Sequence, residues 1–157
     1  MYYRLYHPAD FEPLYAIEER CFQPPLRFSR AYMRRVIGNP DSATWVAEEI
    51  AEEPGRMAGF GNVEWDGPDH DRYAYIQTLE VSPEHRRRGI ARELLTRLEQ
   101  SAQAAGAAAI WLHVDTENTS AIRLYEAHGY TRQGREEHYY ARHRPAYVYS
   151  KAVALGS

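Results

Sequence analysis

One stretch of the chain decides the fold class: Leu79-Glu80-Val81-Ser82-Pro83-Glu84-His85-Arg86-Arg87-Arg88-Gly89-Ile90-Ala91-Arg92. Upstream, residues 73–81 are rich in aromatic and β-branched side chains and predict a strand, which Pro83 ends. Downstream, apolar residues at helical spacing predict an amphipathic helix; they are Ile90, Leu94, Leu95 and Leu98. The stretch is therefore a strand, a basic loop and a helix in direct succession.

The junction between this loop and the helix has the properties of an anion site. The first N–H groups of a helix have no partner within the helix and lie at the positive end of its dipole. Where they face a cleft, they bind phosphate groups. Gly89 allows a close approach to the backbone, Ala91 leaves room, and the flanking arginines add charge-assisted hydrogen bonds. The competing interpretation is a solvated basic loop in front of a surface helix.

Composition limits the remaining possibilities. The chain has 157 residues, a net charge of −3 and one cysteine, Cys21. We therefore expect no intramolecular disulfide, no zinc–thiolate cluster or other bound metal, and no nucleic-acid partner. No stretch approaches the roughly 18 apolar residues of a membrane span, and the first residues lack the layout of a secretion signal. We expect a cytoplasmic protein that does not bind membranes.

The rest of the chain predicts an α/β fold around one central sheet. Helices alternate with strands after a strand-rich middle section, which is typical of this class. The predicted strands are residues 3–6, 43–49, 57–65, 73–81, 108–114, 130 onward and 147–153, and the predicted helices are 10–21, 29–38, 90–106 and 120–128. Without repeats or a linker, the chain is expected to form a single domain over residues 1–157.

Two blocks of sequence resemble the GNAT acetyltransferase superfamily. Arg86-x-x-Gly89-x-Ala91 resembles its coenzyme A pyrophosphate signature, Q/R-x-x-G-x-G/A. Residues 111–130 resemble its second block, a strand followed by Asn118, a helix with A-x-x-L-Y and a closing Gly129-Tyr130. The resemblance implies the GNAT fold, a mostly antiparallel sheet splayed at its middle strands and flanked by about four helices. It also implies an acetyl-CoA-dependent N-acetyltransferase that transfers acetyl directly to an amine.

The resemblance also implies a set of donor-binding residues. Unpaired N–H groups of the strand that ends at residues 79–81 would bind the thioester oxygen and the pantetheine arm. Asn118 would hydrogen-bond the cofactor, although a purely structural capping role is also open. The full implied set for acetyl-CoA is Leu79, Val81, Arg86, Arg87, Arg88, Gly89, Ile90, Ala91, Arg92 and Asn118.

The chain resembles the N-terminal protein acetyltransferases of this superfamily most strongly, through residues 75–79 and His138-Tyr139-Tyr140. This resemblance implies a peptide α-amine as acceptor, held by Pro25, Leu26, Tyr139 and Tyr140. Three alternatives stay open: acetylation of lysine side chains, acetylation of polyamines or another small amine, and a non-catalytic acyl-CoA-binding module. The assembly is expected to be a monomer or homodimer.

Amide formation from a thioester needs a base for the amine and an acid for the leaving thiolate. His113 is the preferred base, through an ordered water and with Tyr75 in the relay, because imidazole titrates near pH 6.5. Glu80 is the rival base. Tyr125 suits the acid role because a phenol stays protonated at neutral pH.

Overall fold

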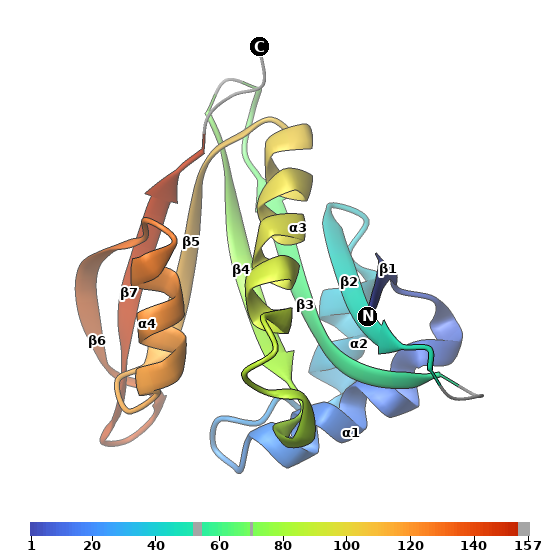
Figure 1. Cartoon of the computed structure of the whole chain (residues 1–157). Coiled ribbons are helices and arrows are strands. Elements are labelled where there is room, and N and C mark those ends of the chain that lie inside the picture. The colour runs from blue at the N-terminus through green and yellow to red at the C-terminus, as the bar shows by residue number, and fades with distance from the viewer. Residues whose placement is uncertain (52–54, 70, 154–157) are drawn as a thin grey trace.

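A computed structural model of the chain describes residues 1–51, 55–69 and 71–153. The described residues form one seven-stranded sheet in the order β1-β2-β3-β4-β5-β7-β6 (Figure 1). The strands are β1 (Tyr2–Leu5), β2 (Ser42–Glu49), β3 (Arg56–Asp66), β4 (Arg72–Val81), β5 (Ala107–Asp115), β6 (Thr131–Ala141) and β7 (Arg144–Ala152). Only the β4–β5 pair in this sheet is parallel.

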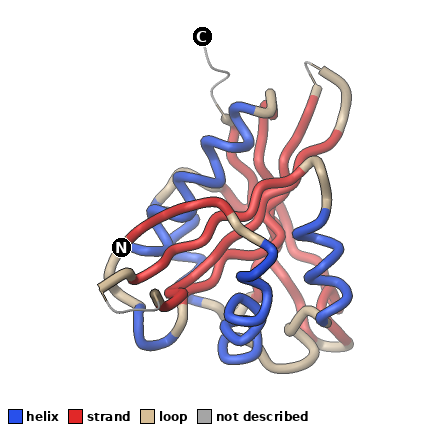
Figure 2. Tube along the Cα trace, turned by 90° about the vertical axis from the view of Figure 1, so that its right-hand side faces the viewer, coloured by secondary structure: helices blue, strands red, loops and turns tan. Residues whose placement is uncertain are grey.

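Helices cover both faces of the sheet (Figure 2). On one face, α1 (Phe11–Cys21) and α2 (Arg30–Gly38) bury Leu14 and Met33 against Val46 and Phe60. On the other face, α3 (Ile90–Ala104) and α4 (Thr119–Ala127) pack on the central strands, and their buried residues include Leu94, Leu95, Leu98 and Tyr125. The predicted mixed α/β architecture with helices around one sheet is confirmed.

The two central strands separate halfway along their length. Pairing between β4 and β5 ends at Ile76 and Leu112, whereas β4 stays paired with β3 as far as Val81. A bulge in the β3–β4 ladder, where Asn62 pairs with Thr78 and Val63 pairs with Ile76, leaves Gln77 unpaired on the β3 side. In Figure 1 the two strands diverge toward the end at which α3 begins. The predicted splay of the sheet is confirmed, and it opens a gap between the two halves.

A short 3₁₀ helix, η2 (Pro83–His85), and the basic loop connect β4 to α3. In the part of the chain that the structure describes, no helix has both the length and the apolar character needed to cross a bilayer.

Candidate active site

A cleft of about 970 Å³ lies at the open end of the splayed strands. Its walls are the last residues of β4, the first turn of α3, the start of α4 and the loop that follows α1. This volume is at the upper end of the range for small-molecule sites. The cleft therefore has room for a ligand much larger than an amino acid.

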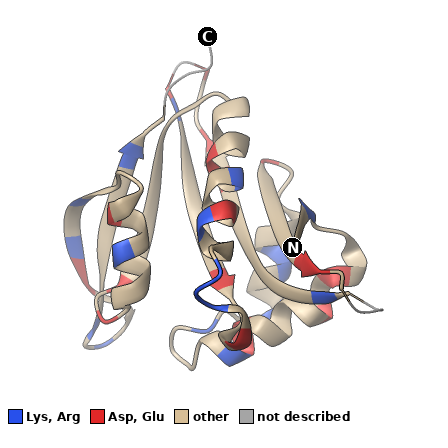
Figure 3. Ribbon diagram, viewed as in Figure 1, with Lys and Arg blue, Asp and Glu red and all other residues tan. Residues whose placement is uncertain are grey.

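The floor of the cleft contains the predicted anion site. Gly89 has φ of 77°, in the left-handed region that favours glycine, and a Cβ atom added there would find no other atom within 4 Å. Arg86, Arg87 and Arg92 line the cleft beside it. Arg88 lies outside, with its guanidinium 3.9 Å from Glu49. Figure 3 shows the loop that precedes α3 in the sequence as a continuous basic segment.

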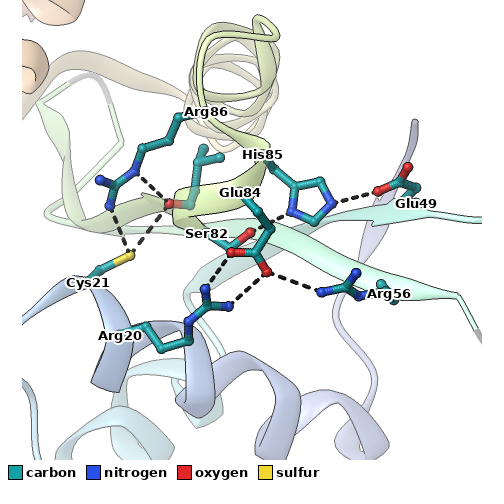
Figure 4. A network of polar contacts seen from close by, with 9 residues as sticks. Arg20, Cys21, Glu49, Arg56, Ser82, Glu84, His85 and Arg86 are labelled. Carbon is teal, nitrogen blue, oxygen red and sulfur yellow. Dashed lines mark hydrogen bonds and ion pairs between the residues drawn. The ribbon is translucent and has the colours of Figure 1, made fainter.

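A network of polar contacts holds this loop in place (Figure 4). Glu84 accepts hydrogen bonds from Arg20 of α1 and Arg56 of β3, and the Arg20 hydrogen bond lowers the pKa of Glu84 to about 2. The buried ring of His85 bridges Ser82, at 2.6 Å from Nδ1, and Glu49, at 2.6 Å from Nε2. These contacts tie η2, directly before the basic loop, to α1, β2 and β3.

Arg86 also has a structural role within this network. Its Nε donates to the carbonyl oxygen of Val81 at 3.2 Å, and its Nη2 lies 3.5 Å from Sγ of Cys21. The same thiol donates to the Val81 carbonyl at 3.5 Å. Cys21 therefore lies in the cleft wall, although it is far from the basic loop in the sequence.

The opposite wall carries Tyr125 and Asn118, both of which line the cleft. Burial raises the pKa of Tyr125 above its ordinary value, and the nearby Glu80 carboxylate adds to the shift. The phenol is therefore protonated at neutral pH. The side chain of Asn118 accepts a hydrogen bond from the Ala121 N–H at 3.2 Å, so it caps α4 while it faces the cleft.

Glu80 is fully buried next to a second carboxyl group, that of Glu18 on α1. Glu80 accepts a hydrogen bond from the Thr78 hydroxyl, and Glu18 accepts one from the Phe28 N–H at 3.0 Å. The remaining oxygen of each group, Oε1, has no hydrogen-bond partner among the described residues. Burial, followed by the neighbouring Glu18, raises the pKa of Glu80 well above its ordinary value. One proton between the two groups would satisfy both orphaned oxygens.

Tyr75 and His113 meet where the splay begins, one residue from the last β4–β5 pair on each strand. The Tyr75 hydroxyl lies 2.7 Å from His113 Nδ1 and 3.2 Å from the Tyr139 hydroxyl. The rings of His113 and Tyr139 are stacked, with centroids 4.0 Å apart. The structure thus brings together three of the predicted site residues, from β4, β5 and β6.

Residues 11–130 match the sequence profile of the acetyltransferase (GNAT) family. The chain belongs to this family. GNAT enzymes use acetyl-CoA as the acetyl donor, so this chain is an acetyl-CoA-dependent N-acetyltransferase. Its cleft fits the donor: there is open space above Gly89, and arginines flank the free N–H groups of α3.

Solved structures share this GNAT fold over nearly the whole chain. NAA60 of Arabidopsis thaliana, in complex with a bisubstrate analogue, has 24% identity, a TM-score of 0.86 and coverage of 99% of both chains. The ribosomal-protein-S18-alanine N-acetyltransferase of Escherichia coli has 22% identity and a TM-score of 0.81, over 99% of this chain and 96% of that one. Nourseothricin acetyltransferase has 26% identity and a TM-score of 0.76, with 98% of both chains covered.

The residues predicted to hold the acceptor fall into two groups in this GNAT enzyme. Pro25 and Leu26 line the cleft that contains Gly89, in the loop between α1 and α2. Tyr139 and Tyr140 lie near the hairpin between β6 and β7, where they pack edge to face at 4.8 Å. Tyr139 contacts the Tyr75–His113 pair, and burial raises the pKa of Tyr140 above its ordinary value.

Two contacts of this site were not expected from the sequence. Glu18 lies on the buried stripe of α1, four residues from Leu14, and a carboxylate at that spacing is a recognisable signal. Glu136 lies 3.1 Å from His113 Nε2, but it comes from an exposed and highly charged part of β6. Nothing in the local sequence distinguishes it from its neighbours.

Proposed function

We propose that this GNAT enzyme is a single-domain protein that acetylates the α-amine of a peptide N-terminus. The observation that carries the proposal is the shared cleft: the loop containing Pro25 and Leu26 lines the same cavity as the anion site at Gly89. An acceptor bound against this loop would lie beside the donor. The similar Escherichia coli enzyme, named for a ribosomal-protein alanine, supports a peptide acceptor.

On the donor side, each residue has a role that follows from its position. The N–H groups at Gly89, Ile90 and Ala91, together with Arg86, Arg87 and Arg92, would hold the phosphate groups. The main chain of Leu79 and Val81, on the unpaired edge of β4, would hold the amide-containing arm. Arg88 contributes through long-range attraction, because its side chain lies outside the cleft. Acetyl-CoA itself supplies an activated acetyl thioester when it is bound.

The base assigned here is His113, acting through Tyr75. Its Nδ1 faces the Tyr75 hydroxyl at 2.7 Å, so a proton that reaches the phenol oxygen has a direct path to the imidazole. Glu80 is a poorer base at neutral pH, because its raised pKa and its orphaned oxygen favour a proton shared with Glu18. The amine proton would pass to Tyr75 through a water molecule, and the phenol's own proton would pass to His113.

The acid assigned here is Tyr125. Its phenol lines the cleft, and its raised pKa keeps a proton on the oxygen until a thiolate leaves. A thiol titrates near 8.5, so the coenzyme A product is protonated at neutral pH, and the phenol can supply that proton as the C–S bond breaks. The side-chain oxygen of Asn118 caps α4, and its side-chain N–H groups would donate hydrogen bonds to the donor.

A small cationic amine is the second candidate acceptor, and one feature favours it. A pocket of about 280 Å³ is lined by Asp41, Glu64 and Asp66 together with Trp65 and Tyr75. Carboxylates and aromatic faces both attract cationic groups. Tyr75 lines this pocket and contacts His113, so the pocket reaches the proposed base. A similar structure that covers 98% of the chain, nourseothricin acetyltransferase, is named for an acceptor that is not a protein.

The test is an acetylation screen that separates these acceptors. Peptides that differ in their first two residues are compared with α-amine-blocked peptides carrying a free lysine and with linear polyamines. Mass spectrometry locates the acetyl group on each product. Acetylation of α-amines with a preference among first residues supports the proposal. Exclusive modification of lysine side chains or polyamines refutes it and selects the corresponding alternative. Donor binding without turnover on any amine would indicate a non-catalytic module.

A further inference from the structure

The relay proposed above ends at His113, whose second ring nitrogen also has a neighbour. The His113 side chain is 16% exposed, and its Nε2 lies 3.1 Å from a carboxylate oxygen of Glu136 on β6. No hydrogen bond from Nε2 forms within the described residues. Since the atoms are within ion-pair distance, a small rotation of either side chain would make the bond.

The ring has few other neighbours that could titrate. Tyr75 of β4 contacts Nδ1, Tyr139 of β6 stacks on the ring, and Tyr32 of α2 lies close enough to raise the pKa of both phenols. On β7 the residue opposite His113 is Val148. Within the described chain, Glu136 is the carboxylate at ion-pair distance from this imidazole.

The direction of the hydrogen bond between Tyr75 and His113 and the tautomer of the ring are linked. Burial raises the pKa of Tyr75 far above its ordinary value, so the phenol carries its proton. A neutral imidazole has one N–H donor and one acceptor nitrogen. If Tyr75 donates to Nδ1, the ring proton must be on Nε2, which faces Glu136. A carboxylate that accepts from Nε2 holds the ring in the tautomer that leaves Nδ1 ready for a proton.

We propose that Glu136 is a positioning residue for the proton relay, and that it selects the Nε2–H tautomer of His113 and balances the charge of the protonated ring. When the amine loses its proton, the Tyr75 proton moves to Nδ1 and the phenol oxygen takes the proton delivered by water. The ring then carries two N–H groups and one positive charge, with Glu136 beside it. No bond other than O–H and N–H changes, and the proton count is conserved.

The proposal rests on the relay in the proposed function, so its first test needs no acceptor. Nitrogen-15 chemical shifts of the His113 ring are recorded by NMR in the full-length wild-type protein, and His113→Asn assigns the signals. We expect the neutral ring to carry its proton on Nε2. Glu136→Ala, which removes the acceptor, should give a mixture of tautomers. The matched control is Glu137→Gln, which alters a neighbouring carboxylate paired with Arg135 and should leave the ring signals unchanged.

The second test measures turnover against pH with an amine that the wild-type enzyme acetylates. Glu136→Gln keeps an acceptor but removes the charge, so the protonated ring loses its partner and the low-pH limb should move to lower pH. Because the Glu136 side chain is largely exposed, we expect a modest effect, about a threefold loss of plateau rate. The Glu137→Gln profile should match the wild type.

Two results would overturn the proposal: a ring proton on Nδ1 in the wild-type protein, or Glu136 variants that cannot be distinguished from Glu137→Gln. Failure of the proposed function gives a different pattern. In that case the NMR result holds while no peptide α-amine is acetylated.

Discussion

Replacing Glu80 by glutamine tests the shared proton and the choice of base together. The amide can accept from the Thr78 hydroxyl and donate to the orphaned oxygen of Glu18, so it reproduces the protonated acid at every pH. In the wild type, the raised pKa of Glu80 means that its contribution to stability is fully present below about pH 4.3. That contribution is lost as the pH rises through the folded-state pKa. Glu80→Gln avoids this loss.

The size of the effect follows from the orphaned oxygens. An unsatisfied buried acceptor costs about 1–3 kcal/mol, and 1 kcal/mol changes the Tm of a chain of this length by about 3 °C. We expect Glu80→Gln to raise Tm at pH 8 by about 3–9 °C and to have a much smaller effect at pH 5, as measured by calorimetry. The control Glu19→Gln changes an exposed carboxylate on the same helix as Glu18 and should show no such pH dependence.

The same variant reports on catalysis. With His113 as the base, turnover of Glu80→Gln should stay within about threefold of the wild type. The substitution then changes the free energy of unfolding but leaves the base in place. A lower Tm than the wild type at pH 8 would refute the shared proton. A loss of turnover of about a hundredfold or more, as expected for removal of a general base, would assign that role to Glu80.

Three further substitutions address the remaining parts of the site. Tyr125→Phe should lower turnover at least about tenfold while the acetyl-CoA affinity measured by calorimetry changes little, and equal turnover would discard the acid role. Gly89→Glu should abolish acetyl-CoA binding, because it adds negative charge and forces a side chain into a left-handed backbone conformation; unchanged affinity would refute the anion site. Glu84 has a pKa lowered to about 2, so its stabilising contribution is present above about pH 4.3 and is lost toward pH 2. Glu84→Gln should therefore have a lower Tm than the wild type at pH 6 and equal it near pH 2, and a gap that persists at pH 2 would contradict this.

The elements of the fold could be predicted because their signals are local. Ser29, at the start of the predicted helix 29–38, accepts the Tyr32 N–H at 3.1 Å as a helix cap, and Gly89 directly precedes α3 as predicted. Both depend on the preferences of one residue and its immediate neighbours. The resemblance to the GNAT family extended these signals to a mostly antiparallel sheet that is splayed at its middle strands.

The partners across the site could not be predicted in the same way. The contact between Glu18 and Glu80 joins residues 62 positions apart, and that between His113 and Glu136 depends on where β6 lies relative to β5. β6 does not pair with β5 directly, since β7 lies between them. The position of Arg88 outside the cleft also depends on a residue far away in the sequence. Glu49 of β2 pairs with its guanidinium, on the side away from the cleft.

The separation of β4 from β5 has a thermodynamic consequence. Beyond Ile76 and Leu112, β4 and β5 are not paired with each other, so the amide-containing arm of the donor, bound as proposed, would occupy the place of the missing backbone hydrogen bonds. The ends of β4 and β5, unpaired with each other, would then have hydrogen-bond partners that the ligand-free protein lacks. Since such a ligand binds only the folded protein, the resistance of the whole sheet to heat should rise with the logarithm of its concentration. Bound in this way, the donor would stabilise the two halves of the sheet against separation.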